Sequence, residues 1–525
     1  MTRVAVIGGG HNGLVCACYL VNAGLEVTVF EANSEPGGCI WTEQLPSGHR
    51  LERGAIDHGM ILGVADELGL DRFGLEYVFR DLSVGAGYGD GNRLLFHRDL
   101  DDTLAGLTNL REQDRSGYGR LAQVGSALLG MLDSFTSPPS LGQIAELGTI
   151  GDFDPLHTLL TSAEKLVSAE ISDPHLSSAL TMYGSFSQLP PWLPGTGLFG
   201  LLLPAGHGHG AGRPVGGSAR LIKALVGCLE SGGGRILTDQ AVTSVEWKGK
   251  EGRVTTSSGD EYAADVVVSA LDVVRTADLL PDRPSDLDRA ARLSASGALN
   301  IAEFKLDLAL SSPAVPGRFG HPEALWLLQQ QPGSISKGFA EIAAGRCPSE
   351  PAMLWASPSA LDPSAAPNGE GVAWLSTFVP ARLEGGEWSE AGASDYVEEL
   401  IEQYEQVTGS KMRDQIVSMK VSGPLTWERR TGARFGNPNH IDMTIDQMFA
   451  LRPATGRGYR TEVPWLYLTG AGTFPGGGLS GVAGKNTALT LLQDLGGGRT
   501  RRFRPAETLS SLWKGWRLYR SLTRP

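Results

Sequence analysis

The sequence predicts an α/β fold in which a Rossmann-like domain with a parallel sheet is joined to a discontinuous second domain of mixed α+β character. Three observations predict it. A short apolar run near the N-terminus leads into a glycine loop and then a helical pattern. A second run of the same kind lies near the C-terminus. Short strands and long helical stretches alternate between them, and the 525 residues suffice for several domain-sized units.

The N-terminal unit begins with the fully apolar run 4–7, which is typical of a parallel strand buried on both faces. Gly8, Gly10 and Gly13 follow it as G-x-G-x-x-G at the start of a helical pattern. In such a loop Gly8 allows the tight turn, Gly10 lets the backbone approach a pyrophosphate, and Gly13 lets the helix pack on the strand. The segment therefore predicts a dinucleotide-binding site.

The next strand, 27–30, ends at Glu31, about twenty residues after Gly10. A carboxylate at this place accepts a hydrogen bond from the ribose 2′-hydroxyl and repels a 2′-phosphate, so NADP is disfavoured. We expect Asn12, inside the glycine loop, to contact the cofactor as well. His11 is expected to shape the loop and to take no part in chemistry.

The C-terminal unit consists of a strand at 465–468, a glycine-dense loop at 469–481 and a helix at 482–492. Free N–H groups at such a helix start can bind an anion or a polarised carbonyl. The expected cofactor contacts in this loop are Gly472, Gly478, Leu479 and Ser480.

Between these units, Gly216-Gly217 precedes a helix at 219–230, and short strands separated by turns form a meander that returns to the main sheet. We therefore assign residues 1–60, 213–285 and 455–495 to the cofactor-binding domain. Residues 61–212, mostly helical in pattern over 105–185, and 286–454 are assigned to the substrate domain.

A further segment carries a family resemblance. Gly37, Gly38 and Thr42 resemble the G-G-x-x-x-T signature that follows the ribose acid in large two-domain flavoproteins, although Cys39 stands where an arginine is common. From Val4 to about Leu492 the chain resembles the phytoene desaturase-like branch of the FAD-dependent oxidoreductases, which is related to the flavin amine oxidases and has a GR2-type FAD-binding domain. The resemblance implies that FAD is the cofactor. It also implies that Gly37, Gly38 and Thr42 pass close to FAD and that the backbone of Val242 contacts its adenine.

The resemblance implies that the flavin performs the redox step. The protein groups then position the substrate and exclude water. Lys305 is one candidate, because amine oxidase relatives carry a lysine on a comparable strand that binds the flavin through water; a solvated strand face is the alternative. His440 and Asp442 alternate on one face of an extended segment, where the acid could tune a general base. Asp57 and His58 are expected to approach the cofactor or to serve packing.

The activity implied is dehydrogenation of a carbon–carbon bond in a lipophilic or conjugated small molecule by hydride transfer to the flavin. The alternatives are an amine or imine oxidase of secondary metabolism, and a saturase or isomerase without net redox change; a flavoprotein that has lost catalysis is a fourth. No second strand–G-x-G-x-x-G–helix unit exists, so the electron acceptor is external: oxygen, a quinone or another protein.

Composition limits the partners and the compartment. A net charge of −13 disfavours nucleic acid as a partner. The five cysteines include no C-x-x-C pair, which indicates a reducing compartment and no zinc site. Two histidines, His207 and His209, are too few ligands to predict a metal site. No signal peptide and no apolar run near twenty residues is present, so the expected location is cytoplasmic.

Residues 496–525 differ from the rest of the chain. They carry eight basic side chains and one acid, Glu507, with apolar residues at helical spacing. Such a basic amphipathic helix suits an anionic membrane surface, which would make the protein peripheral at the membrane. The alternatives are packing on its own acidic body and an oligomer contact.

Overall fold

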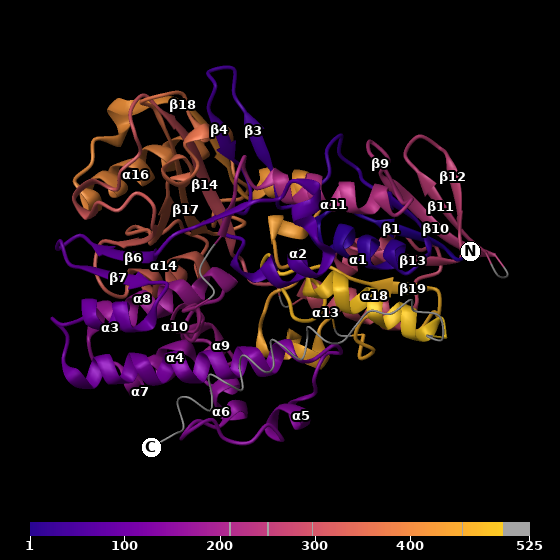
Figure 1. Cartoon of the computed structure of the whole chain (residues 1–525), viewed down its shortest axis with the longest axis horizontal. Helices are drawn as coiled ribbons and strands as arrows, with labels where there is room; N and C mark the ends of the chain where they lie inside the picture. The colour runs from indigo at the N-terminus through magenta and orange to yellow at the C-terminus, as the bar shows by residue number, and fades with distance from the viewer. Residues whose placement is uncertain (209–211, 249–250, 297, 454, 497–525) are drawn as a thin grey trace.

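The computed structural model describes residues 1–208, 212–248, 251–296, 298–453 and 455–496. A five-stranded parallel sheet forms one half of the molecule, on the right in Figure 1. Its strand order is β19 (Leu466–Leu468), β13 (Val266–Ser269), β1 (Arg3–Ile7), β2 (Glu26–Phe30) and β9 (Arg235–Leu237). The chain therefore builds this sheet from three segments that lie far apart in the sequence.

Alternating side chains divide the parallel sheet into two buried faces. Val4 and Val6 pack with the helices of one layer, whereas Ala5 and Ile7 pack on the other side. The first layer contains α1 (His11–Asn22), α2 (Leu62–Leu68), α11 (Ala219–Ser231) and α18 (Val482–Asp494). The second contains the antiparallel meander β10 (Val242–Lys248), β11 (Glu251–Thr256) and β12 (Glu261–Ala264), with α12 (Val273–Asp278) and α13 (Ser285–Ser296).

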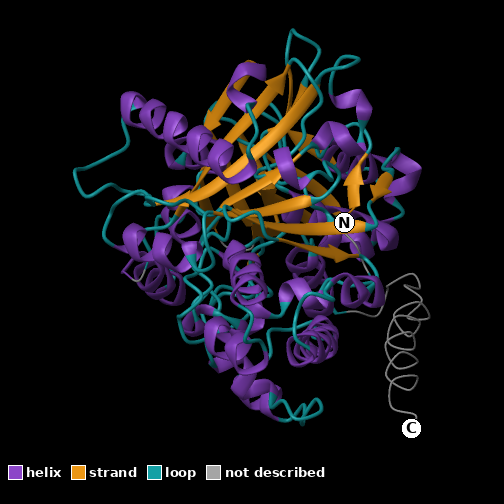
Figure 2. Cartoon of the chain, turned by 90° about the vertical axis from the view of Figure 1, so that its left-hand side faces the viewer, coloured by secondary structure: helices purple, strands orange, loops and turns teal. Residues whose placement is uncertain are grey.

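A seven-stranded mixed sheet forms the core of the other half. Its order is β18 (Ile416–Ser422), β14 (Ala302–Leu310), β17 (Gly371–Val379), β16 (Met353–Ala356), β15 (Leu325–Gln329), β6 (Leu82–Tyr88) and β7 (Arg93–His97). Leu325 and Leu327 face a large cluster with the helices below the sheet, and Trp326 and Leu328 face α16 (Glu390–Thr408). Figure 2 shows the strands in the upper half and most helices gathered beneath them.

The helices beneath this sheet come mainly from the segment between β7 and β8. They are α3 (Leu100–Gly106), α4 (Glu112–Asp133), α5 (Leu141–Ala145), α6 (Pro155–Leu160), α7 (Ala163–Glu170), α8 (Pro174–Gly184), α9 (Gly197–Gly200) and α10 (Leu202–Ala205). Further along the chain lie α14 (Ser334–Ala343), α15 (Pro358–Leu361) and α17 (Pro424–Thr431). The helical pattern predicted over 105–185 is present.

Two short ribbons connect the halves. One pairs β3 (Thr42–Gln44) with β4 (Arg50–Glu52), and the other pairs β5 (Tyr77–Phe79) with β8 (Gly212–Pro214). Both ribbons lie where a segment of the first half crosses into the second.

The predicted α/β fold with a Rossmann-like domain is confirmed. The predicted domain boundaries stay a prediction, and α2 and α13 pack against the parallel sheet although the boundaries at 60 and 285 assign them to the substrate domain. Within the described ranges no helix is long and apolar enough to span a membrane. Of the predicted tail, residues 497–525 lie outside the described part of the chain.

Candidate cofactor and active site

The loop between β1 and α1 has the geometry that its glycines predict. Gly8 has φ +102°, a conformation that favours glycine. A Cβ at Gly13 would overlap the carbonyl oxygen of Gly8, so α1 approaches β1 more closely than any side chain allows. Gly10 differs: its backbone is ordinary, φ −69° and ψ 165°, and the nearest atom to a Cβ there is Gly38 Cα at 3.9 Å. Gly10 therefore faces space that no described protein atom fills.

The Gly37-Gly38 segment lies directly against this loop. Gly37 N donates to Gly9 O at 2.9 Å, and Gly10 and Gly37 form an isolated parallel bridge. Gly37 and Gly38 both have positive φ, +141° and +58°. The two glycine segments thus form one backbone cradle, as the sequence predicts.

Glu31 lies at the far end of the cradle. Its side chain is buried and accepts from Gly9 N at 2.9 Å and from Asn33 N at 2.9 Å, so the carboxylate is fixed beside the glycine loop. Gln240 N donates to Glu31 O at 2.9 Å, and Val242 begins β10 two residues later. The predicted ribose and adenine contacts therefore lie at neighbouring places.

The C-terminal glycine loop meets the N-terminal one. A Cβ at Gly484 would overlap Asn12 O, which shows how closely α18 packs on α1. Burial lowers the pKa of His11 to about 4, and a contact with the Gly478 backbone opposes this in part. Leu479 and Ser480 are buried at the start of α18. Segments more than 450 residues apart in sequence thus form one site.

A residue that sequence reasoning missed fixes this loop. The guanidinium of Arg452 is fully buried and donates to five backbone carbonyls. Two of its donors reach Ala471 O, at 3.0 and 2.6 Å; the other acceptors are the carbonyls of Asn439, Ile441, Asp442 and Gln447. Arg452 therefore ties the 439–447 segment to the C-terminal glycine loop, a role with no local sequence signal.

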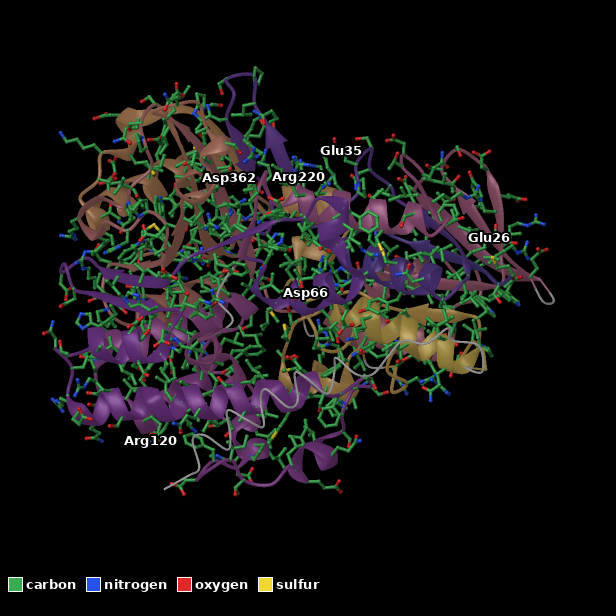
Figure 3. All side chains as sticks on the ribbon, viewed as in Figure 1. Glu26, Glu35, Asp66, Arg120, Arg220 and Asp362 are labelled. Atoms are coloured by element: carbon green, nitrogen blue, oxygen red, sulfur yellow. The ribbon has the colours of Figure 1, made fainter. Side chains whose placement is uncertain are left out.

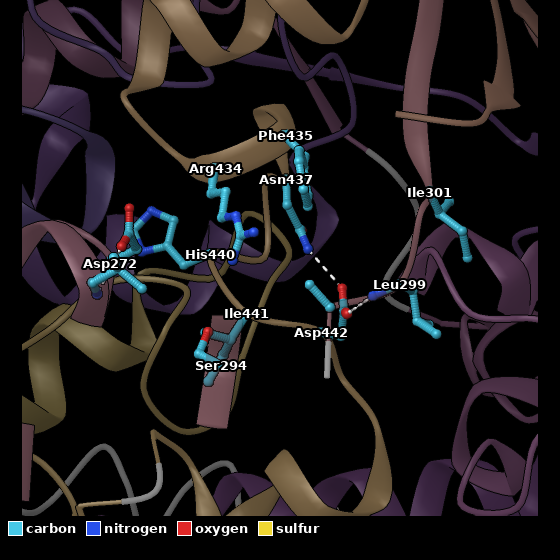
Figure 4. A pocket seen from close by; sticks show the side chains of 12 residues that line it. Asp272, Ser294, Leu299, Ile301, Arg434, Phe435, Asn437, His440, Ile441 and Asp442 are labelled. Carbon is cyan, nitrogen blue, oxygen red and sulfur yellow. Dashed lines mark hydrogen bonds between the residues drawn. The ribbon is translucent and has the colours of Figure 1, made fainter. Parts of the chain in front are cut away.

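The expected pairing of His440 with Asp442 is wrong. His440 has φ +63°, so the segment is not extended and its side chains do not alternate. Asp442 accepts from Asn437 Nδ2 at 2.8 Å and from Leu299 N at 2.6 Å, as the dashed lines in Figure 4 show. Both residues line a small cleft between α12 and the 434–442 segment.

Lys305 lies on β14 beside Asp307, but the alternative of a solvated strand face is wrong. The Lys305 ammonium is fully buried, pairs with Asp307 Oδ1 at 2.9 Å and donates to the Glu52 carbonyl. Burial lowers the pKa of Lys305 and raises that of Asp307. Arg53 Nε, 3.1 Å from Asp307 Oδ2, completes a buried ion cluster. Any contact of Lys305 with the flavin stays a prediction.

Thr42 bonds to protein groups. Its hydroxyl donates to Glu52 Oε2 at 2.9 Å and accepts from Ala219 N at 3.0 Å, at the first residue of α11. Thr42 therefore caps α11, and its cofactor contact stays a prediction.

Several buried polar atoms around the two loops have no hydrogen-bond partner. They are Asn12 Oδ1, His58 Nε2, His440 Nδ1 and Thr469 Oγ1. His440 packs against Gly470 and Gly472, and burial lowers the pKa of His58 to about 3. Orphaned buried polar atoms indicate an unseen polar partner. Together with the open space at Gly10, they fit a dinucleotide that runs from Glu31 past Gly10 toward the C-terminal loop. The contacts of individual residues stay predictions.

The parallel sheet, the glycine cradle, the ribose carboxylate and the converging C-terminal loop define a dinucleotide-dependent flavoprotein with a separate substrate half. A family model described as flavin containing amine oxidoreductase matches residues 13–422. The chain belongs to this family. It is an FAD-dependent oxidoreductase, and the predictions of family, cofactor and enzyme class are confirmed.

Curated relatives match nearly the whole chain. A phytoene desaturase (lycopene-forming) from Pseudescherichia vulneris is 26% identical over 94% of this chain and 100% of its own. A 4,4'-diapolycopen-4-al dehydrogenase from Metabacillus indicus is 24% identical over 91% and 94%. The rat pyridine nucleotide-disulfide oxidoreductase domain-containing protein 2 is 26% identical over 93% of both chains.

Solved structures share the fold. Putrescine oxidase with bound putrescine matches with a TM-score of 0.60 at 16% identity, over 94% of this chain and 99% of its own. An oxidoreductase from Methanosarcina mazei gives 0.59 at 17% identity, over 94% and 100%. Within the described residues, no group of three or more histidine, cysteine, aspartate or glutamate side chains could hold a metal ion.

Proposed function

We propose that the protein dehydrogenates a carbon–carbon bond of an apolar or conjugated small molecule. The proposal is based on the apolar side chains that surround the C-terminal glycine loop. The largest hydrophobic cluster of the second half includes Phe474 of that loop and Ile56, which follows the Gly37-Gly38 segment. Met60 adds a thioether 3.1 Å from where a Cβ of Gly478 would lie. The phytoene desaturases among the curated relatives favour the same chemistry.

When bound, FAD supplies a two-electron acceptor. Breaking two C–H bonds to form one C=C bond releases a hydride and a proton; bound FAD would take up the hydride, and a base or water would take up the proton. Renewed turnover needs an external acceptor for the two electrons; oxygen, a quinone and a redox protein are the candidates.

The chain's own residues bind the cofactor, orient the bound groups and exclude water. The glycine cradle would hold the pyrophosphate close to its backbone, and Arg452 fixes the C-terminal glycine loop through Ala471 O. Burial lowers the pKa of His440 to about 4, so its ring is neutral near pH 7, and Nδ1, which has no partner among the described residues, can hydrogen-bond to a bound group. The apolar cluster keeps water away from the reacting carbon.

The proposal is tested by anaerobic bleaching of the bound flavin with matched probes. A conjugated polyene, a long-chain alkane derivative and the corresponding primary amine are compared at equal concentration. Reduction by an apolar probe, with a new C=C bond in the product, is the expected result. Reduction by the amine alone contradicts the proposal and identifies an amine oxidase. Conversion of a polyene only by prereduced enzyme identifies a saturase or isomerase.

We propose that the protein works in the cytoplasm and that its basic C-terminal tail brings it to anionic membrane surfaces. The basis is the charge and apolar spacing of residues 496–525, and a lipophilic substrate would be delivered there.

A further inference from the structure

Two buried arginines lie on the β5–β8 ribbon that joins the halves. Arg213 lies in β8, opposite Val78, and Arg80 directly follows β5. Arg80 is 3% exposed and Arg213 is 5% exposed. His58 belongs to the same ribbon, since its N–H donates to Gly212 O at 3.2 Å and its Nδ1 lies 3.2 Å from Tyr77 Oη. The pair is therefore placed between the cofactor loops and the second half.

Most donors of these two guanidinium groups lack a hydrogen-bond partner. Nε and Nη1 of both arginines are buried without a hydrogen bond, and no described residue forms an ion pair or hydrogen bond with the Arg213 side chain. Arg80 forms one ion pair, from Nη2 to Asp57 Oδ2 at 3.4 Å. A buried charged donor without an acceptor is strongly unfavourable, so a partner of negative charge is expected from outside the chain.

The nearby acid Glu52 does not meet this need. Its carboxylate accepts from Ser218 N at 3.1 Å and from Thr42 Oγ1 at 2.9 Å, and burial raises its pKa. Arg50 instead pairs with Asp362 at 2.6 Å. Burial and the neighbouring charge of Arg80 lower the pKa of Arg213 to about 9, which is the response of a cation that lacks a counter-ion.

Space and apolar surface adjoin the pair. Arg213 lines a small cleft with Glu52, Ile56 and Pro358. Ile56 of this cleft belongs to the same hydrophobic cluster as Tyr183, Phe186 and Phe378. An aromatic row begins there: Tyr183 contacts Phe186 with ring centroids 5.9 Å apart, and Phe186 contacts Phe378 at 5.9 Å.

We propose that Arg80 and Arg213 bind the carboxylate of an apolar acid whose hydrocarbon part lies along the aromatic row. Two guanidinium forks suit the two oxygens of a carboxylate, and the row suits an apolar chain. The inference rests on the proposed function and narrows its substrate class. An anionic group of the cofactor is the other source of a partner, and the test separates the two.

The test titrates the holoenzyme with octanoate, octanol and octylamine and follows the visible flavin spectrum. The variants are Arg213→Gln and Arg80→Gln, with Arg220→Gln as the matched control, because Arg220 is an exposed arginine on α11, labelled in Figure 3. We expect octanoate to perturb the spectrum at lower concentration than octanol or octylamine. Its affinity should fall by about tenfold or more in both variants and stay unchanged in the control. Arg213→Lys, which keeps the charge, should recover part of the affinity.

Three outcomes overturn the proposal: equal binding of octanoate and octanol, unchanged octanoate affinity in the variants, or loss of FAD with unchanged octanoate affinity in the remaining holoenzyme. The last result assigns the arginines to the cofactor. Because binding is measured without turnover, oxidation of an amine with octanoate binding intact would refute the proposed function and leave this site standing.

Discussion

Replacing Gly10 by alanine separates cofactor binding from folding. The backbone at Gly10, with φ −69° and ψ 165°, accepts any residue, and the nearest atom to the new methyl group is Gly38 Cα at 3.9 Å. The free energy of unfolding of the apoprotein should therefore change by less than about 0.5 kcal/mol. In the holoenzyme the methyl group occupies the place of the pyrophosphate.

The size of the effect follows from the hydrogen bonds at this place. Displacing the pyrophosphate from the start of α1 removes about two N–H bonds to a charged acceptor, each worth about 1.5–3 kcal/mol. FAD affinity should fall by about 3–6 kcal/mol, or roughly 10²- to 10⁴-fold. The assay is reconstitution of apoprotein with FAD, followed by quenching of flavin fluorescence, beside thermal unfolding of the apoprotein.

Gly13→Ala is the matched control, because its methyl group would overlap Gly8 O with or without cofactor. It should lower the melting temperature of the apoprotein, whereas Gly10→Ala should not. Wild-type FAD affinity in Gly10→Ala would refute the assignment of the cradle.

Three further predictions concern buried groups, and a fourth concerns the tail. Arg452→Met removes the donors to five buried carbonyls, so the free energy of unfolding in urea should fall by at least about 3 kcal/mol. FAD binding should weaken as well. An unchanged urea midpoint would contradict the role of Arg452. Lys305→Met should lower the free energy of unfolding by about 3 kcal/mol, because Asp307 is left with Arg53 alone. The double variant Lys305→Met/Asp307→Leu should regain much of this free energy. Additive losses in the double variant would argue against the buried pair. The pKa of His58 is about 3 in the folded protein and 6.5 in the reference state, so the unfolded chain binds the extra proton below pH 6.5. The contribution of neutral His58 to the free energy of unfolding is therefore complete above pH 6.5 and falls by about 1.4 kcal/mol per pH unit toward pH 3. His58→Asn should remove this contribution from the pH dependence of the free energy of unfolding measured in urea, whereas those of His11 and His440 remain; an unchanged slope would contradict it. Deleting residues 496–525 should leave flavin content unchanged and weaken binding to anionic liposomes, and equal liposome binding would refute the membrane proposal.

Local patterns predicted the parts of the site that are local. The glycine loop at 8–13 was predictable because the strand, the turn and the helix start follow one another, and the same holds for 466–484. Their convergence was predictable only through the family resemblance, since the contact of Gly484 with Asn12 depends on two helices far apart in sequence.

The other features of the site depend on tertiary packing, which the sequence patterns did not show. Alternation placed Lys305 and Asp307 on one face of a strand, but it could not show that β4 and Arg53 cover that face. The left-handed backbone at His440 broke the alternation expected for 439–442. No local sequence pattern marked Arg452 or the Arg80–Arg213 pair. Arg452 matters because backbone carbonyls surround its guanidinium, and Arg80 and Arg213 matter because most of their donors have no acceptor nearby; both depend on tertiary packing.

The assignment of FAD to the two glycine loops is tested by the visible spectrum of the purified protein, recorded before and after denaturation. We expect two flavin bands that pass into the supernatant on denaturation as FAD, in about one equivalent per chain. A protein that is colourless and cannot be reconstituted with FAD would contradict the assignment of the two glycine loops to one flavin site.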